Sequence, residues 1–97
     1  MSQEKITRMV VVANPNGLHA RPADMIVRTA TRFASKIELV KGQERVNGKS
    51  ILEIMTLAAV AGTRLSIEAD GPDAALALDA LAELFGRNFA EEENTQS

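Results

Sequence analysis

Residues 14–23, Asn-Pro-Asn-Gly-Leu-His-Ala-Arg-Pro-Ala, limit the folds open to this chain more than any other segment. Residues 6–12 before it are rich in β-branched side chains, which favour a strand. Because proline fixes φ while asparagine and glycine tolerate positive φ, the first four residues predict a turn. Apolar residues then recur every three or four positions over about residues 20–33, the spacing of an amphipathic helix. The segment therefore joins a strand to a helix.

His19 is the only histidine in the chain and falls at the expected start of this helix. The first backbone N–H groups of a helix lack intrahelical partners, and the helix dipole adds partial positive charge, so this position favours phosphate. Arg21 adds a permanent charge, and a neutral imidazole is a nucleophile near pH 7. The pattern is consistent with a histidine that accepts a phosphoryl group. A helix-capping or solvated polar histidine would show the same spacing.

The elements that follow indicate a mixed fold. Period-two alternation predicts strands over residues 36–39 and 64–69, and Lys-Gly-Gln at 41–43 predicts a hairpin turn before a short strand at 44–46. Ser50 and Glu53 match the capping box of a helix that continues to about residue 61. Residues 70–73 predict the start of a last helix over about 72–89. The order β-α-β-β-α-β-α predicts an α+β domain, with an antiparallel sheet and all helices on one face.

The second helix has apolar residues on two of its sides, whereas a surface helix needs one. One stripe suits the core and comprises Ile54, Leu57, Ala58 and Ala61. The other comprises Ile51, Leu52, Met55 and Ala59. Neighbouring loops could bury this second stripe, or it could lie exposed and bind partners, because exposed apolar residues among polar ones commonly mark interfaces.

Composition excludes several classes of function. The chain has 97 residues, and we expect one domain over 1–90 and an acidic, flexible tail over 91–97. A net charge of −2 provides no basic field for nucleic acid, and the absence of cysteine excludes disulfides and thiolate metal sites. The first residues lack the apolar segment of a signal peptide, and no apolar run is long enough to span a bilayer. We therefore expect a cytoplasmic protein that is not inserted in a membrane.

Two motifs resemble those of the HPr family, the histidine phosphocarriers of the bacterial phosphotransferase system. Residues 17–23, Gly-Leu-His-Ala-Arg-Pro-Ala, are similar to the family's active-site motif, and residues 49–52, Lys-Ser-Ile-Leu, resemble its second signature, around a regulatory serine. The similarity extends to about Phe89. The ending over residues 84–89, followed by acidic residues, also resembles the nitrogen-related branch of the family.

The resemblance implies an open-faced β-sandwich and a phosphocarrier mechanism. His19 would take a phosphoryl group on its δ1 nitrogen from Enzyme I charged by phosphoenolpyruvate, and pass it to an EIIA-type protein. Arg21 would stabilise the phosphate, and the backbone at Gly17 and Ala20 would shape the site. Such a protein is a carrier and not a turnover enzyme, and it needs no metal or organic cofactor.

The resemblance also implies residues for regulation and docking. Ser50 would be the residue that a serine kinase phosphorylates and a phosphorylase dephosphorylates. Arg28, Lys49 and the apolar residues Ile51, Leu52 and Met55 would bind partner proteins. Two alternatives remain at this stage: a regulatory module whose phosphorylation state controls partner binding, and a small ligand-binding domain in which His19 is structural.

Overall fold

The computed structural model describes residues 5–90, so the expected tail at 91–97 lies outside the described residues. Within that range the elements follow the expected order of strands and helices. They are β1 (Lys5–Val11), α1 (Ala20–Ala30), β2 (Lys36–Lys41), β3 (Glu44–Asn47), α2 (Ile51–Thr56), β4 (Arg64–Asp70) and α3 (Ala74–Gly86).

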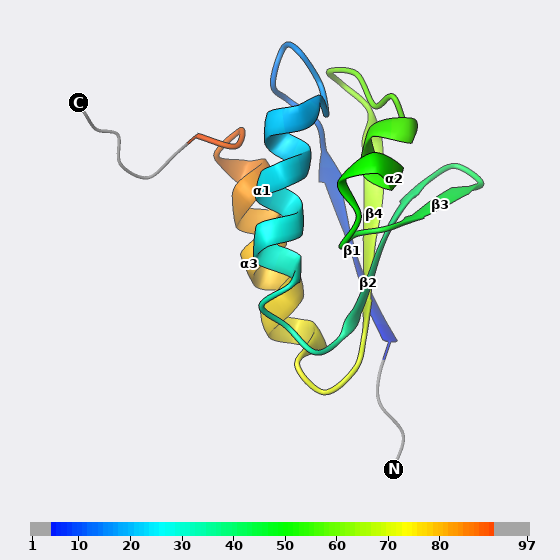
Figure 1. Ribbon diagram of the computed structural model, residues 1–97, viewed down its shortest axis with the longest axis vertical. Helices are drawn as coiled ribbons and strands as arrows, with labels where there is room; N and C mark the ends of the chain where they lie inside the picture. The colour runs from blue at the N-terminus through cyan, green and yellow to red at the C-terminus, as the bar shows by residue number, and fades with distance from the viewer. Residues whose placement is uncertain (1–4, 91–97) are drawn as a thin grey trace.

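The four strands form one antiparallel sheet in the order β1-β4-β2-β3, with β1 and β3 at its edges. Met9 of β1 pairs with Ser66 of β4, which pairs in turn with Val40 of β2. The three helices cover one face of this sheet, and α1 and α3 pack together to the left of the strands in the view of Figure 1. The predicted α+β architecture is therefore confirmed.

The core lies between the sheet and the helices. Alternate residues of the two central strands are fully buried, as period two requires: Ile37 and Leu39 of β2, and Leu65 and Ile67 of β4. Ile26 of α1 is also fully buried against them. Burying a side chain of this size contributes about 1.5–3 kcal/mol, so these positions hold the helices on the sheet.

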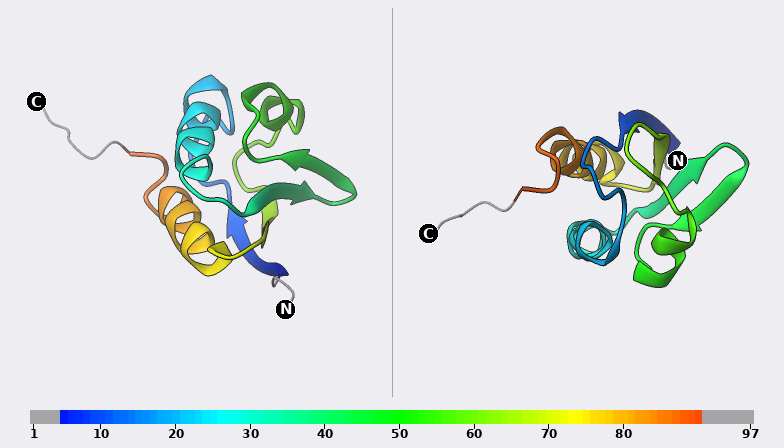
Figure 2. Two further views of the ribbon diagram at one scale, coloured as in Figure 1. Left: turned by 60° about the horizontal axis from the view of Figure 1, so that its bottom comes forward. Right: turned by 90° about the horizontal axis from the view of Figure 1, so that it is seen from above.

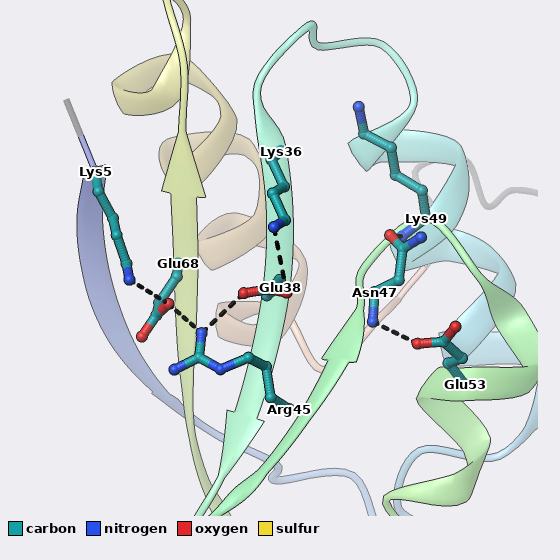
Figure 3. Close-up of polar contacts among 8 residues, drawn as sticks. All are labelled: Lys5, Lys36, Glu38, Arg45, Asn47, Lys49, Glu53 and Glu68. Carbon is teal, nitrogen blue, oxygen red and sulfur yellow. Dashed lines mark hydrogen bonds and ion pairs between the residues drawn. The ribbon is translucent and has the colours of Figure 1, made fainter. Parts of the chain in front are cut away.

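The opposite face of the sheet carries a network of charged side chains (Figure 3). Arg45 binds the carboxylates of both Glu38 and Glu68, and Lys5 lies 3.3 Å from Glu68. The hydrogen bond from Arg45 is the main reason that the pKa of Glu68 lies below its usual value. This face is thus polar, and the chain has one core rather than two.

All three helices are shorter than the sequence predicts. The first ends at Ala30 instead of residue 33, and the second at Thr56 instead of residue 61. The third begins at Ala74 and ends at Gly86, inside the expected range of 72–89. The second and third stop where the backbone turns left-handed, at Ala58 (φ 50°) and at Asn88 (φ 55°), because such residues cannot continue a right-handed helix.

Asp73 precedes α3 but its carboxylate does not cap that helix. It accepts hydrogen bonds from the backbone N–H groups of Ala34 and Ser35, both at 2.9 Å, and from the Ser35 hydroxyl at 2.6 Å. The hydroxyl bond is the main cause of the lowered pKa of Asp73. Asp73 therefore ties the connection between α1 and β2 to the start of α3.

Replacing Asp73 with asparagine should lower the midpoint of thermal unfolding at pH 7 by several degrees, because the amide is a weaker acceptor for these three donors. A carboxyl group with a lowered folded-state pKa stabilises the fold above its unfolded pKa, and that stability is lost as the pH falls through the folded pKa. Thermal unfolding at pH 7 and at pH 3 checks this. The difference between the two proteins should shrink in acid, and an unchanged difference would show that the carboxylate charge is not responsible.

Candidate functional site

His19 is the N-cap residue of α1, as the sequence predicts, with an extended backbone (φ −87°, ψ −164°). Its carbonyl oxygen accepts the N–H of Ala23 and so begins the helix, but its side chain makes no capping hydrogen bond. The residue is exposed to solvent. The imidazole therefore stands at the positive end of a helix and is not used to build it.

The turn before His19 is held by Asn14, a buried residue. The Nδ2 of Asn14 donates to the carbonyl oxygen of Gly17 at 2.7 Å, and the Asn14 carbonyl accepts the Gly17 N–H at 3.1 Å. The N–H of His19 donates to the same Gly17 carbonyl. Asn14 thus fixes the chain on the side from which it enters the helix, as asparagine commonly does in turns.

Gly17 is required at its position for two reasons. Its φ of +69° is one that L-residues with a side chain rarely adopt, and a Cβ atom added there would lie 2.3 Å from the carbonyl oxygen of Ala59. That oxygen accepts the N–H of Leu18 at 2.9 Å. Gly17 and Leu18, the two residues before His19, therefore lie directly against the segment that follows α2.

Two connections meet near the N-terminus of α1. One follows β1, and the other joins α2 to β4 (Figures 1 and 2). Besides the bond from Leu18, Val12 donates to the carbonyl of Thr63 at 2.9 Å and accepts the N–H of Gly62 at 2.6 Å. The site is thus formed where residues about 40 to 50 positions apart in the chain come together.

Ala58 gives the second connection its shape. It has a left-handed backbone, which costs about 1–2 kcal/mol for a residue with a Cβ atom. Ala58 and Ala61 are exposed and Ala59 is buried, so the stripes expected for a longer helix are wrong beyond Leu57. The reason is that α2 ends first and Ala59 turns inward toward Leu18.

Ala58→Gly should raise the free energy of unfolding by about 0.5–1 kcal/mol. Glycine removes the left-handed penalty, and the greater freedom of the unfolded chain offsets part of that gain. Urea unfolding of the two proteins measures the difference. Ala61→Gly, in the same connection and exposed, is the control and should not stabilise the protein. Equal effects at both positions would show that backbone conformation at Ala58 is not the cause.

A depression of about 360 Å³ lies beside His19. Its other lining residues are Asn14, Pro15 and Asn16 from the turn before α1, Arg21 and Pro22 from the start of α1, and Asn88, Phe89 and Ala90 from the segment that follows α3. Phe89 is buried and packs edge-on against Phe85, with ring centroids 4.8 Å apart. The imidazole and a guanidinium therefore share a concave, solvent-accessible space at a helix N-terminus, a place suited to an anion.

The other predicted cations are engaged within the protein. Arg28 Nε donates to the carboxylate of Asp24 one turn earlier, at 2.8 Å, and the side chain remains exposed. Lys49 Nζ donates to the carbonyl oxygen of Phe33 at 2.9 Å. Lys49 thus joins the start of α2 to the connection that follows α1, a structural role that the sequence did not indicate.

Ser50 is the N-cap residue of α2, and its hydroxyl oxygen accepts the N–H of Glu53 at 3.2 Å. This half of the predicted capping box is confirmed. The other half is wrong, because the carboxylate of Glu53 accepts the N–H of Asn47 at 2.9 Å (Figure 3). The N–H of Ser50 donates instead to the Asn47 carbonyl, since the chain turns tightly between β3 and α2.

The predicted apolar patch on α2 is divided by burial. Leu52 is 78% exposed and Met55 is 39% exposed, whereas Ile51 is half-buried against the core. Val60, which sequence reasoning missed, is 66% exposed, and its Cα lies 3.1 Å from the position of a Cβ on Gly17. An exposed apolar residue therefore lies beside Gly17, two positions before His19.

Among residues 5–90, none of the helices combines the length and the hydrophobicity that a membrane-spanning segment needs. The same residues contain no group of three or more histidine, cysteine, aspartate or glutamate side chains arranged to hold a metal ion.

Comparison with known proteins identifies the family. The sequence model of a family described as "PTS HPr component phosphorylation site" matches residues 6–87, most of the chain. The chain belongs to the HPr family. It is 47% identical to the phosphocarrier protein HPr of Treponema pallidum over 87 residues, which cover 90% of this chain and 99% of that protein. It is 41% identical to HPr of Neisseria meningitidis over 88 residues, 91% of this chain and 99% of the relative.

Solved HPr structures share the fold. HPr-C-His from Thermoanaerobacter tengcongensis superposes with a TM-score of 0.82 at 39% identity, over 93% of this chain and 99% of that one. HPr from Bacillus anthracis gives 0.79 at 42% identity, over 84% and 96%. The Bacillus subtilis protein Crh, called a catabolite repression HPr, gives 0.62 at 38% identity, over 92% and 100%. The open-faced arrangement of the sheet and its helices is thus the HPr fold.

Proposed function

We propose that this member of the HPr family carries its phosphoryl group on His19, taking it from phosphoenolpyruvate-charged Enzyme I and passing it to an EIIA-type protein. One observation supports this most strongly: the only histidine of the chain is an exposed N-cap residue in a depression that it shares with Arg21. Membership in the family then supplies the reaction class.

In the proposed step, a lone pair on the imidazole attacks phosphorus, a P–N bond forms, and the bond between phosphorus and the donor breaks. By likeness to the family the attacking atom is Nδ1, which is unprotonated in the attacking tautomer, and the proton on Nε2 then passes to solvent or to the donor. Positioning and electrostatics dominate phosphoryl transfer, so the protein's task is to hold the imidazole and screen the phosphate charge. Arg21 and the first backbone N–H groups of α1 screen it, and the backbone at Gly17 and Ala20 sets the entry to the helix.

The docking surface is proposed to combine the exposed apolar residues of α2 with cations of α1. Leu52 and Met55 would enter a hydrophobic depression on each partner, and Arg28 would steer acidic partners. Ile51 and Lys49 would support this surface from below, since both are held against the rest of the protein. The protein would meet these partners in the cytoplasm.

A two-step relay tests the function. The protein is first charged with phosphoenolpyruvate and a catalytic amount of Enzyme I, and Enzyme I is then removed. Adding EIIA should discharge the protein, with one phosphoryl group gained by EIIA for each one lost. Release as inorganic phosphate at the same rate with and without EIIA would refute the carrier function. Testing EIIA proteins for sugars and for nitrogen regulation identifies the pathway.

A second candidate function is regulation through Ser50. Its hydroxyl is at the N-terminus of α2, beside exposed Leu52, and the similar protein Crh is named for catabolite repression. Phosphorylation would add about 1.5–2 negative charges, which a helix N-terminus tolerates but which an acidic partner would meet as repulsion. An HPr kinase should add one acid-stable phosphate that Ser50→Ala prevents. Charging of His19 by Enzyme I should then slow by about tenfold or more.

A further inference from the structure

Lys41, at the end of β2, makes a contact outside the site described above. It follows Ile37 and Leu39 on the face of the strand that carries the helices. Its Nζ donates a hydrogen bond of 2.7 Å to the carbonyl oxygen of Leu57, the residue that ends α2. Carbonyl groups at a helix C-terminus lack intrahelical donors and carry partial negative charge, so an ammonium group stabilises them.

The Leu57 carbonyl begins the turn that supports the residue before His19. Ala58 follows with a left-handed backbone, and the carbonyl oxygen of Ala59 then receives the N–H of Leu18 at 2.9 Å. The same oxygen lies so close to Gly17 that a Cβ atom there would overlap it. Any shift of this turn is therefore passed directly to the entry of α1.

We propose that Lys41 is a positioning residue for His19, acting through the turn at residues 57–59. An alanine disfavours the left-handed conformation, so the turn depends on hydrogen bonds from outside itself to keep its shape. Lys41 provides such a bond from the sheet. Because phosphoryl transfer is sensitive to the placement of the attacking atom, loosening the turn should slow the transfer step. This inference rests on the proposed function of His19.

The test compares Lys41→Met with the unchanged protein, since methionine keeps an unbranched side chain but lacks the ammonium group. Two quantities are measured: the kinetics of charging by phospho-Enzyme I, and hydrogen exchange of the Leu18 amide by NMR. We expect kcat to fall by about fivefold with KM nearly constant, because binding surfaces are untouched and only placement changes. Exchange of the Leu18 amide should accelerate by about tenfold, while the amides of Ile67 in the central strand stay protected.

Lys36→Met is the matched control. Lys36 is also a lysine of β2, but it lies on the opposite face and its ion pair with Glu38 is long, at 3.9 Å. It should leave both kcat and Leu18 exchange unchanged. Lys41→Arg, which keeps the charge and can still donate to Leu57, should recover at least half of the lost kcat.

Ala58→Gly provides the second test and covers the case in which Lys41→Met folds poorly. Glycine accepts the left-handed conformation, so the double variant with Lys41→Met should regain protection of the Leu18 amide. The proposal is overturned if Lys41→Met leaves Leu18 exchange unchanged, or if Lys36→Met slows charging equally. The exchange measurement does not depend on phosphoryl chemistry, so failure of the proposed function would appear separately, as charging that survives loss of His19.

Discussion

His19→Gln should abolish charging by phospho-Enzyme I, with a loss of more than about 10³-fold in kcat/KM, because glutamine offers no nucleophilic nitrogen. No other histidine is present to take over. The side chain is exposed and makes no capping hydrogen bond, so the fold should be retained. Incubation with phosphoenolpyruvate and Enzyme I, followed by intact-mass measurement over time, gives the rate.

The control for this variant is Arg21→Gln, at the neighbouring position that shares the depression. Losing the guanidinium removes charge screening but keeps the nucleophile, so charging should slow by about 10–10³-fold without disappearing. Circular dichroism of both variants should match that of the unchanged protein. Charging of His19→Gln at a normal rate would contradict the assignment of the acceptor.

Gly17→Ala should be the most destabilising of the single substitutions considered. The φ of +69° alone costs an alanine about 1–2 kcal/mol, and its Cβ would lie 2.3 Å from the carbonyl oxygen of Ala59, which would have to shift. The free energy of unfolding is expected to fall by about 2–4 kcal/mol in total, which lowers the Tm of a domain of this size by roughly 10–20 °C. Charging should slow as well, because the hydrogen bond from the Leu18 N–H to the Ala59 carbonyl must lengthen and the entry to α1 shifts with it.

Gly42→Ala is the matched control for strain. Gly42 has nearly the same φ, +60°, but nothing lies within 4 Å of the position its Cβ would take. The left-handed backbone alone should lower the free energy of unfolding of this variant, by about 1–2 kcal/mol, and charging should be unchanged. Thermal unfolding and charging kinetics of both variants separate the two effects. Equal losses would show that contact with Ala59 contributes nothing.

The order of elements was predictable because local patterns determine it. Ile37 and Leu39 alternate with charged neighbours, and the buried positions Ala74, Leu78, Leu81 and Phe85 repeat at helical spacing. Both patterns reflect a single buried face, which any packed arrangement of these elements must satisfy. The sheet order β1-β4-β2-β3 is a different kind of property, since it depends on contacts between distant strands.

The helix ends were harder to predict, and Ala58 shows why. A left-handed residue is usually announced by glycine or asparagine, but here the chain has alanine, one of the best helix formers. Tertiary bonds from Lys41 and Leu18 outweigh this local preference. The capping-box geometry of Glu53 failed for a related reason, because the nearby N–H of Asn47 competes for its carboxylate.

Half of the site could be anticipated from sequence. His19 and Arg21 are adjacent to a predicted helix start, so the general properties of helix termini were enough to place them. Ala59 and Phe89 could not be assigned to the site in this way, because they arrive from distant segments. The exposure of Val60 could not be predicted either, because the sequence pattern places this residue inside a helix that in the structure ends at Thr56.

The measurement that tests the central claim most directly is ³¹P NMR of the protein after charging with phosphoenolpyruvate and Enzyme I, combined with peptide mapping. We predict one phosphoryl group per chain, with the shift of a phosphohistidine, stable in alkali, lost in acid and located on the peptide that contains His19. An acid-stable phosphate, or a label on any other residue, would contradict the account of His19 as the carrier.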